Sequence, residues 1–203
     1  MKFIAIDTET GGLNPEVHGL TEIAMVAFDF DPNTGNYNVL GEFVECVIPN
    51  EELAYCPKAL DMQRRTFSSL ETFGKPEKEV SDAAVAFIYK HLGGHDEWSG
   101  KFIAHYADFD YGFVSHFFAR TEHNNLFPLK KRSSWVCTRN MARILWSLGI
   151  IDPAGLHQDQ VADVYGISSE GRHTALADAK VCMEIFAGMT WSMRRMSQNK
   201  GVK

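Results

Sequence analysis

The order of the predicted strands and helices constrains the fold of this chain more than any other sequence feature. Three apolar segments rich in β-branched residues come first, and loops rich in Gly, Pro and Asn join them as in an antiparallel meander. Strand and helix patterns then alternate, which is typical of strands connected through helices. We therefore expect an α/β fold with a mixed β-sheet, an antiparallel N-terminal meander plus parallel strands, flanked by α-helices.

The apolar patterns set the predicted boundaries of these elements. The predicted strands are residues 2–7, 21–30, 37–48, 101–106 and 134–137. The predicted helices are residues 81–92, with Ser81 as N-cap, and residues 108–120, 138–148, 158–165 and 174–189. The chain of 203 residues fits one domain over residues 1–193, followed by a polar, basic tail over residues 194–203 that frays.

Composition excludes several classes of protein. Hydrophobic residues make up 45% and charged residues 23% of the chain, values that fit a folded globular domain and exclude a collagenous or disordered one. No apolar run approaches the roughly 18 residues of a membrane span, and Asp7 interrupts the N-terminal apolar stretch too early for a signal peptide. The four cysteines lack CxxC spacing, which argues against a disulfide framework and a zinc site. We expect a cytoplasmic protein that does not bind membranes.

The charge balance bears on possible nucleic-acid partners. The net charge of −6 argues against a protein that holds duplex DNA on a broad basic surface. It does not argue against an enzyme that acts on nucleic acid, because carboxylates that hold divalent cations make a chain acidic while the bound ions reverse the local charge. The positions of the acidic residues therefore matter more than their number.

Asp7 and Glu9 follow an apolar strand pattern and are two residues apart. Side chains at positions i and i+2 of a strand point to the same face, so the strand would bring the two carboxylates side by side. Like charges this close favour a bound cation. The alternative is that both residues lie in the loop after the strand. Gly11 and Gly12 favour the first interpretation, because they would let a ligand approach the backbone beside the acids.

Two further segments combine acidic residues with a predicted helix start. Asp108 and Asp110 open the helix at residues 108–120; we assign the N-cap to Asp108 and leave Asp110 free for chemistry. His173 precedes Asp178 by five residues, where the last helix begins. A histidine in the loop before that helix could reach a water molecule near Asp178, although a histidine at a helix start is more often a solvated or capping group.

Three segments, in this order, resemble the motifs of the DEDD superfamily of 3′-to-5′ exonucleases in its histidine subclass. They are DTETGGL at residues 7–13, IAHYADFD at residues 103–110 and HTALADA at residues 173–179. The resemblance implies a ribonuclease H-like fold. It also implies the catalytic residues, namely the metal ligands Asp7, Glu9, Asp110 and Asp178 and the general base His173.

The same resemblance implies a cofactor and a substrate. Four carboxylates suit two divalent ions, and hard oxygen ligands favour Mg²⁺ or Mn²⁺ over zinc. The expected partner is a nucleic acid with a free 3′ end, which would be shortened to nucleoside 5′-monophosphates. The residues expected to bind its terminal nucleotide are Thr8, Thr10, Gly11, Gly12, Leu13 and Phe109.

The residues leave alternatives open within this function. Residues 135–146 are most similar to cellular exonucleases that act on DNA, and we expect single-stranded or frayed DNA ends as substrate. An exoribonuclease of the RNase T or oligoribonuclease kind is the alternative, and a non-catalytic nucleic-acid-binding module is a third. A protein partner such as a polymerase also stays open.

A few residues depart from the pattern or have two interpretations. Tyr106 stands where the family usually has Asn, which puts the local hydrogen bonds in doubt. Phe109 belongs to a group of phenylalanines with partly helical spacing, which favours the core over a stacking platform for bases. Residues 130–132, Lys-Lys-Arg, could contact phosphates or form a solvated loop with equal odds.

Overall fold

The computed structural model describes residues 1–94, 100–123, 132–168 and 174–199, and it contains one five-stranded sheet in these ranges. The strand order is β3-β2-β1-β4-β5. Antiparallel pairing joins β1 to β2 and β2 to β3, whereas β4 pairs parallel with β1 and with β5. The predicted mixed sheet is thus confirmed. Its strands are β1 (Lys2–Thr10), β2 (Leu20–Phe30), β3 (Tyr37–Cys46), β4 (Phe102–Ala104) and β5 (Trp135–Cys137).

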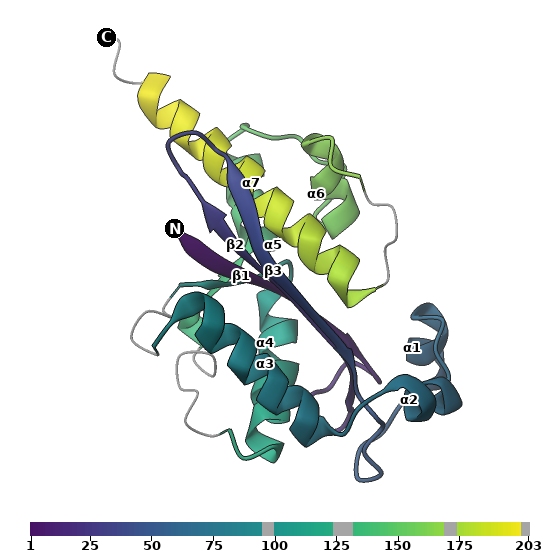
Figure 1. Cartoon of the computed structure of the whole chain (residues 1–203). Helices are drawn as coiled ribbons and strands as arrows, with labels where there is room; N and C mark the ends of the chain where they lie inside the picture. Colours follow the sequence, from purple (N-terminus) through teal and green to yellow (C-terminus); the bar gives the residue numbers. More distant parts are fainter. Residues whose placement is uncertain (95–99, 124–131, 169–173, 200–203) are drawn as a thin grey trace.

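Helices cover both faces of the sheet (Figure 1). Along β1, alternate side chains enter two different cores, as the two-residue period of a strand requires. Ile4 and Ile6 pack with α3 (Glu77–Leu92) and α4 (Ala107–Arg120), while Phe3 and Ala5 pack with α7 (Ala175–Asn199). A third cluster joins α7 to α5 (Thr138–Ser147) and α6 (Gln158–Val164).

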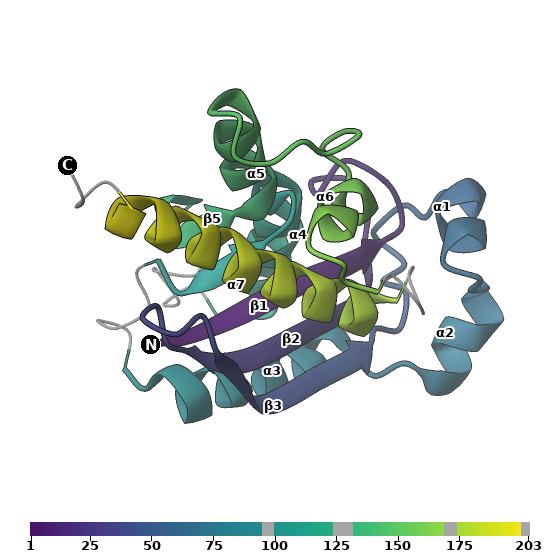
Figure 2. The same cartoon turned by 90° about the horizontal axis from the view of Figure 1, so that it is seen from above.

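Two short helices that the sequence analysis did not predict lie beside one end of the sheet. They are α1 (Pro57–Met62) and α2 (Phe67–Phe73), and both views place them at the end toward which β1 points (Figures 1 and 2). Each buries a single residue, Leu60 in α1 and Leu70 in α2. One buried residue in six or seven gives no helical periodicity, so the pattern of apolar residues could not reveal either helix.

Several predicted boundaries were wrong for identifiable reasons. The helix expected from residue 81 begins at Glu77 after Pro76, and Ser81 lies inside it, where its hydroxyl donates a hydrogen bond to the Lys78 carbonyl at 2.9 Å instead of capping the helix. Asp108 is not the N-cap of α4 either. Tyr106 holds that position without a side-chain cap, and the Asp108 carboxylate accepts a hydrogen bond from Arg132 in a 3₁₀ turn (Arg132–Ser134).

The last helix is longer than predicted. It extends past Met193 to Asn199, ten residues beyond the end expected at residue 189. The guanidinium of Arg194 donates a hydrogen bond to Asn33 Oδ1 at 2.8 Å, so part of the expected tail contacts the turn between β2 and β3. The domain boundary at residue 193 remains a prediction. In the described part of the chain, no helix combines the length and the apolar character that crossing a membrane requires.

Candidate active site

Strand β1 brings Asp7 and Glu9 to the same face, as their spacing predicts. The strand continues through Thr10, so both acids lie within it and not in the loop that follows. The antiparallel register places Glu22 of β2 directly opposite Glu9. The position is therefore crowded with acidic groups, and a carboxylate crowded by others needs either a proton or a cation.

Two helices add one carboxylate each. One oxygen from each of Asp7, Glu9 and Asp178 lies within 4.8 Å of the others, although Asp178 belongs to α7 at the far end of the sequence. Asp110, in the first turn of α4, is joined to β1 by Thr8, whose backbone N–H and hydroxyl donate to Asp110 Oδ1 at 3.1 and 2.9 Å. Asp110 and Asp178 are buried, with exposed fractions of only 4% and 8%.

The electrostatics of this cluster favour a cation. Burial and the charges of Asp110 and Asp178 raise the pKa of Asp7 well above its usual range. Burial, followed by the charge of Asp178, raises the pKa of Glu9 to about 7, and burial also raises the pKa of Asp110 to about 7 despite its hydrogen bonds with Thr8. Oxygen donors that repel one another in this way fit a hard divalent cation, which would return them to their charged forms.

The metal-free protein should lose stability as the pH rises. Glu9 and Asp110 have higher pKa values in the folded chain than the roughly 4 to 4.5 of the unfolded one, so only the folded state holds their protons in that interval. The free energy of unfolding in EDTA should therefore fall by several kcal/mol between about pH 4.5 and 7, at roughly 1.4 kcal/mol per pH unit for each group. Denaturant melts at several pH values would measure this.

Matched variants identify the source of this pH dependence. Glu9→Gln should make the fall shallower by the share of one carboxyl group, because an amide does not titrate while Asp110 still does, whereas Glu51→Gln on an exposed loop should keep the wild-type slope. Saturating magnesium should also remove the fall in the wild-type protein. A slope that Glu9→Gln leaves unchanged would contradict this assignment.

A groove of about 580 Å³ adjoins the acidic cluster. Thr8, Glu9, Thr10, Gly12 and Leu13 line it from β1 and the loop that follows. Its opposite wall comes from Phe109 of α4 and from α1 with its flanking residues, namely Cys56, Lys58, Ala59, Met62 and Gln63. Five of the six residues expected to bind substrate therefore line one groove, and Gly11 is buried beside it.

The glycines after β1 also meet side chains of this chain. A Cβ atom at Gly11 would collide with the Tyr55 ring, and a Cβ atom at Gly12 would collide with the His18 ring. The Thr10 hydroxyl donates to the Gly12 carbonyl at 2.7 Å, which closes the turn between them. These contacts require small residues at both positions whether or not a ligand is bound.

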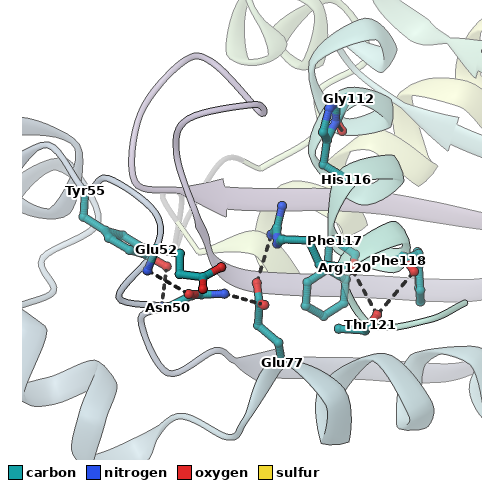
Figure 3. A network of polar contacts seen from close by, with 10 residues as sticks. All are labelled: Asn50, Glu52, Tyr55, Glu77, Gly112, His116, Phe117, Phe118, Arg120 and Thr121. Atoms are coloured by element: carbon teal, nitrogen blue, oxygen red, sulfur yellow. Dashed lines mark hydrogen bonds and ion pairs between the residues drawn. The ribbon is translucent and has the colours of Figure 1, made fainter.

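A polar network connects α3 and α4 to Tyr55, whose ring packs against this loop (Figure 3). Arg120 of α4 donates to Glu77 of α3 at 2.9 Å, and the Asn50 side-chain amide donates to the same carboxylate at 3.1 Å. The Asn50 backbone N–H donates to the Tyr55 hydroxyl at 2.9 Å. The helix that carries Asp110 is thus connected to the tyrosine that packs against the loop after β1.

The sequence analysis missed residues that connect α1 and α2 to the site. Gln63 donates to the Thr10 carbonyl at 2.7 Å and accepts from the Thr21 hydroxyl at 2.7 Å. Arg65 forms an ion pair with the buried Glu22, the residue opposite Glu9 in the sheet. The charge on Arg65 opposes the rise in the pKa of Glu9. An acidic residue inside an otherwise apolar strand pattern was the available signal for Glu22.

Some predicted residues cannot be placed in the site. His173 lies outside the described residues, as do Lys130 and Lys131, so their roles stay predictions. Phe109 has both of the expected environments: its ring lies 4.9 Å from that of Phe113 beside the core, and it also lines the groove.

Comparison with known proteins identifies the family and the fold of this chain. The RNase_T family model, described as Exonuclease, matches residues 4–186. Exonuclease I of E. coli in complex with a dT13 oligonucleotide aligns with a TM-score of 0.78 at 16% identity, over 98% of this chain and 43% of that one. The zinc-bound form of the E. coli exonuclease I complex with single-stranded DNA gives 0.75 at 16% identity, over 96% and 41%. This chain therefore spans less than half the length of those enzymes and shares their ribonuclease H-like exonuclease fold.

Proposed function

Because this chain belongs to the RNase_T exonuclease family of the DEDD superfamily, we propose that it is a metal-dependent 3′-to-5′ exonuclease acting on DNA, with single-stranded or frayed ends preferred. The observation that carries the proposal is the meeting of Asp7, Glu9, Asp110 and Asp178 at one edge of the sheet. These four acids come from β1, α4 and α7, segments far apart in the sequence, and their mutual repulsion serves no structural purpose.

The four carboxylates would hold two divalent ions, Mg²⁺ or Mn²⁺. Bound ions of this kind supply charge stabilisation for an attacking hydroxide and a departing alkoxide. The hydrogen bonds from Thr8 hold Asp110 in place before any ion binds, which limits the reorganisation that binding requires.

The groove beside the acids would bind the 3′-terminal nucleotide. Leu13, Met62 and Phe109 offer apolar surface to a base, and Leu13 is 85% exposed, so a ligand can reach its side chain. Lys58 on the same wall supplies a positive charge for a phosphate. A terminal base must leave its stack to enter such a groove, which favours single strands and frayed ends over blunt duplexes.

His173 would complete the reaction as the general base of the histidine subclass. It would accept a proton from the attacking water, whose oxygen forms the new bond to phosphorus. The bond between phosphorus and the 3′-oxygen of the preceding nucleotide then breaks. The products are a nucleoside 5′-monophosphate and a strand that ends in a new 3′-hydroxyl.

A substrate comparison tests this function. With magnesium present, 5′-labelled single-stranded DNA should shorten one nucleotide at a time from its 3′ end, faster than a blunt duplex of the same sequence, because only the single strand presents unstacked terminal bases. Denaturing gels and chromatography of the released mononucleotide would measure both properties. A matched RNA strand serves as the third arm, and a faster rate on RNA would identify an exoribonuclease instead.

Two controls make the test decisive. A strand that ends in a 3′-phosphate should resist cleavage, since the groove is expected to hold a free 3′-hydroxyl. EDTA should abolish release from every substrate. Absence of any metal-dependent mononucleotide release would overturn the enzyme assignment in favour of a binding module.

A further inference from the structure

An exposed aromatic–cation pair lies near the candidate active site but outside its groove. Tyr106, at the N-cap of α4, is 51% exposed, and the guanidinium carbon of Arg139 lies 4.8 Å from the centre of its ring. The Arg139 backbone N–H donates to the His105 carbonyl at 3.0 Å, which fixes the start of α5 against the end of β4. The two side chains are thus held together by the backbone as well as by their own contact.

The topology places this pair at the catalytic edge of the sheet. In the parallel register Ala104 pairs with Cys137, so Tyr106 and Arg139 each follow the carboxyl end of a strand by two residues. β4 is also parallel to β1, whose own carboxyl end carries Asp7 and Glu9. Ligands of open α/β sheets bind at this end of the strands. Tyr106 also precedes Asp110 by four residues, about one helical turn or 6 Å along α4.

Arg139 forms no ion pair with any residue in the part of the chain that the structure describes. Other arginines near the site have carboxylate partners, as Arg65 has Glu22 and Arg132 has Asp108. A guanidinium that no described carboxylate neutralises is available to bind a phosphate through its N–H groups.

The exposed ring fits a nucleobase. A tyrosine with a structural role is usually buried with its hydroxyl bonded, whereas half of Tyr106 is open and, within the described ranges, its hydroxyl has no hydrogen-bond partner. A guanidinium stacks through its face and donates hydrogen bonds through its edge, so Arg139 can stack on the ring and bind a phosphate at once. The accessible part of the ring remains available for stacking on a base.

We propose that Tyr106 and Arg139 form a second binding site for the substrate strand, in which a base stacks on Tyr106 and the adjoining phosphate binds Arg139. This proposal rests on the proposed exonuclease function. Neither residue lines the groove for the terminal nucleotide, whereas Phe109, one turn into α4, does. We place the pair beyond the two nucleotides that flank the cleaved bond, so a longer strand reaches it and a dinucleotide does not.

Binding and cleavage measured against strand length test this proposal. The substrates are a 5′-labelled dT strand of about twelve nucleotides, within the usual range of single-strand sites, and the matching dinucleotide. In Tyr106→Ala, the ratio of kcat/KM for the long strand to kcat/KM for the dinucleotide should fall roughly tenfold, the order expected for one lost base stack, and the change should lie mainly in KM. Tyr106→Phe should restore the ratio, because it keeps the ring.

The salt dependence tests Arg139 separately. In Arg139→Ala, the slope of log Kd against log salt for the long strand should decrease by roughly 0.7, the value for one lost phosphate contact on a single strand. Fluorescence anisotropy in EDTA measures this without any turnover. Arg194→Ala is the matched control: Arg194 is exposed and bonded to Asn33 at the opposite end of the sheet, so its variant should keep the wild-type slope.

The possible results distinguish failure of the second binding site from failure of the proposed exonuclease function. If Tyr106→Ala lowers kcat/KM by the same factor for the long strand and for the dinucleotide, Tyr106 has a structural role and the second binding site is wrong. An unchanged ratio, or an unchanged salt slope in Arg139→Ala, would do the same. If the wild-type protein releases no mononucleotide, the proposed function fails, and anisotropy measurements in EDTA on Tyr106→Ala and Arg139→Ala still decide whether the two residues bind the strand.

Discussion

Replacing Asp7 with Asn should reduce the rate of mononucleotide release by roughly 10²- to 10³-fold, the scale on which one preorganised electrostatic group contributes to catalysis. One oxygen of Asp7 lies within 4.8 Å of an oxygen of Glu9 and of Asp178, so the cluster loses one carboxylate charge while its shape is kept. The same variant should be more stable than wild type in EDTA, because burial and like charges oppose ionisation of Asp7 in the metal-free fold. Single-turnover assays and thermal melts measure the two effects.

Asp7→Asn should lower activity and raise stability, and this combination distinguishes loss of a catalytic group from unfolding. A variant that loses activity because it unfolds would melt earlier, not later. Asp152→Asn, on an exposed loop residue, is the control for removing one negative charge and should change neither property appreciably. Wild-type turnover in Asp7→Asn would exclude the acidic cluster as the catalytic centre.

Replacing His173 with Ala should lower the rate by roughly 10²- to 10⁴-fold, the usual contribution of a general base. In the wild-type enzyme, the rate should rise with pH through the imidazole pKa, roughly 6.5 when unperturbed, and then level off as the neutral form predominates. His173→Ala should lose that inflection while its affinity for the divalent ion changes little, since carboxylates are the expected ligands. Rate profiles from pH 5 to 9 under saturating metal measure this.

Two further variants complete that experiment. His173→Asn should behave like His173→Ala, because an amide cannot accept the proton at neutral pH. His123→Ala is the control: His123 pairs with Asp82 on α3, and its variant should keep the wild-type profile. If His173→Ala retains both the rate and the inflection, another group is the base.

The sequence predicted those strands and helices in which buried residues recur at a constant spacing along the whole segment. The alternation along β1 predicted that Asp7 and Glu9 share a face, and the element order predicted the mixed sheet. The helix α4 was also predicted, because Phe113, Phe117 and Phe118 repeat at partly helical spacing, and all three are buried.

Elements held by distant contacts could not be predicted in this way. The helices α1 and α2 are connected to the sheet by Gln63 and Arg65, whose partners Thr10 and Glu22 are more than forty residues away. The four N-terminal residues of α3 were missed for a related reason. Its start is set by Pro76 and not by an apolar repeat, and Ser81, a favoured capping residue, lies inside the helix.

The acidic cluster is complete only when α7 has packed on the sheet. Asp178 lies on α7, which packs on β1 and β2 through Phe186 against Phe3 and Phe28. A growing chain can form the meander early, since its strands are neighbours in sequence, but Asp178 joins Asp7 only after α7 has left the ribosome and docked. A chain without a docked α7 thus lacks the complete acidic cluster, and if that cluster is the catalytic centre, nuclease activity in refolding experiments should return with the docking of α7, after the strands have paired.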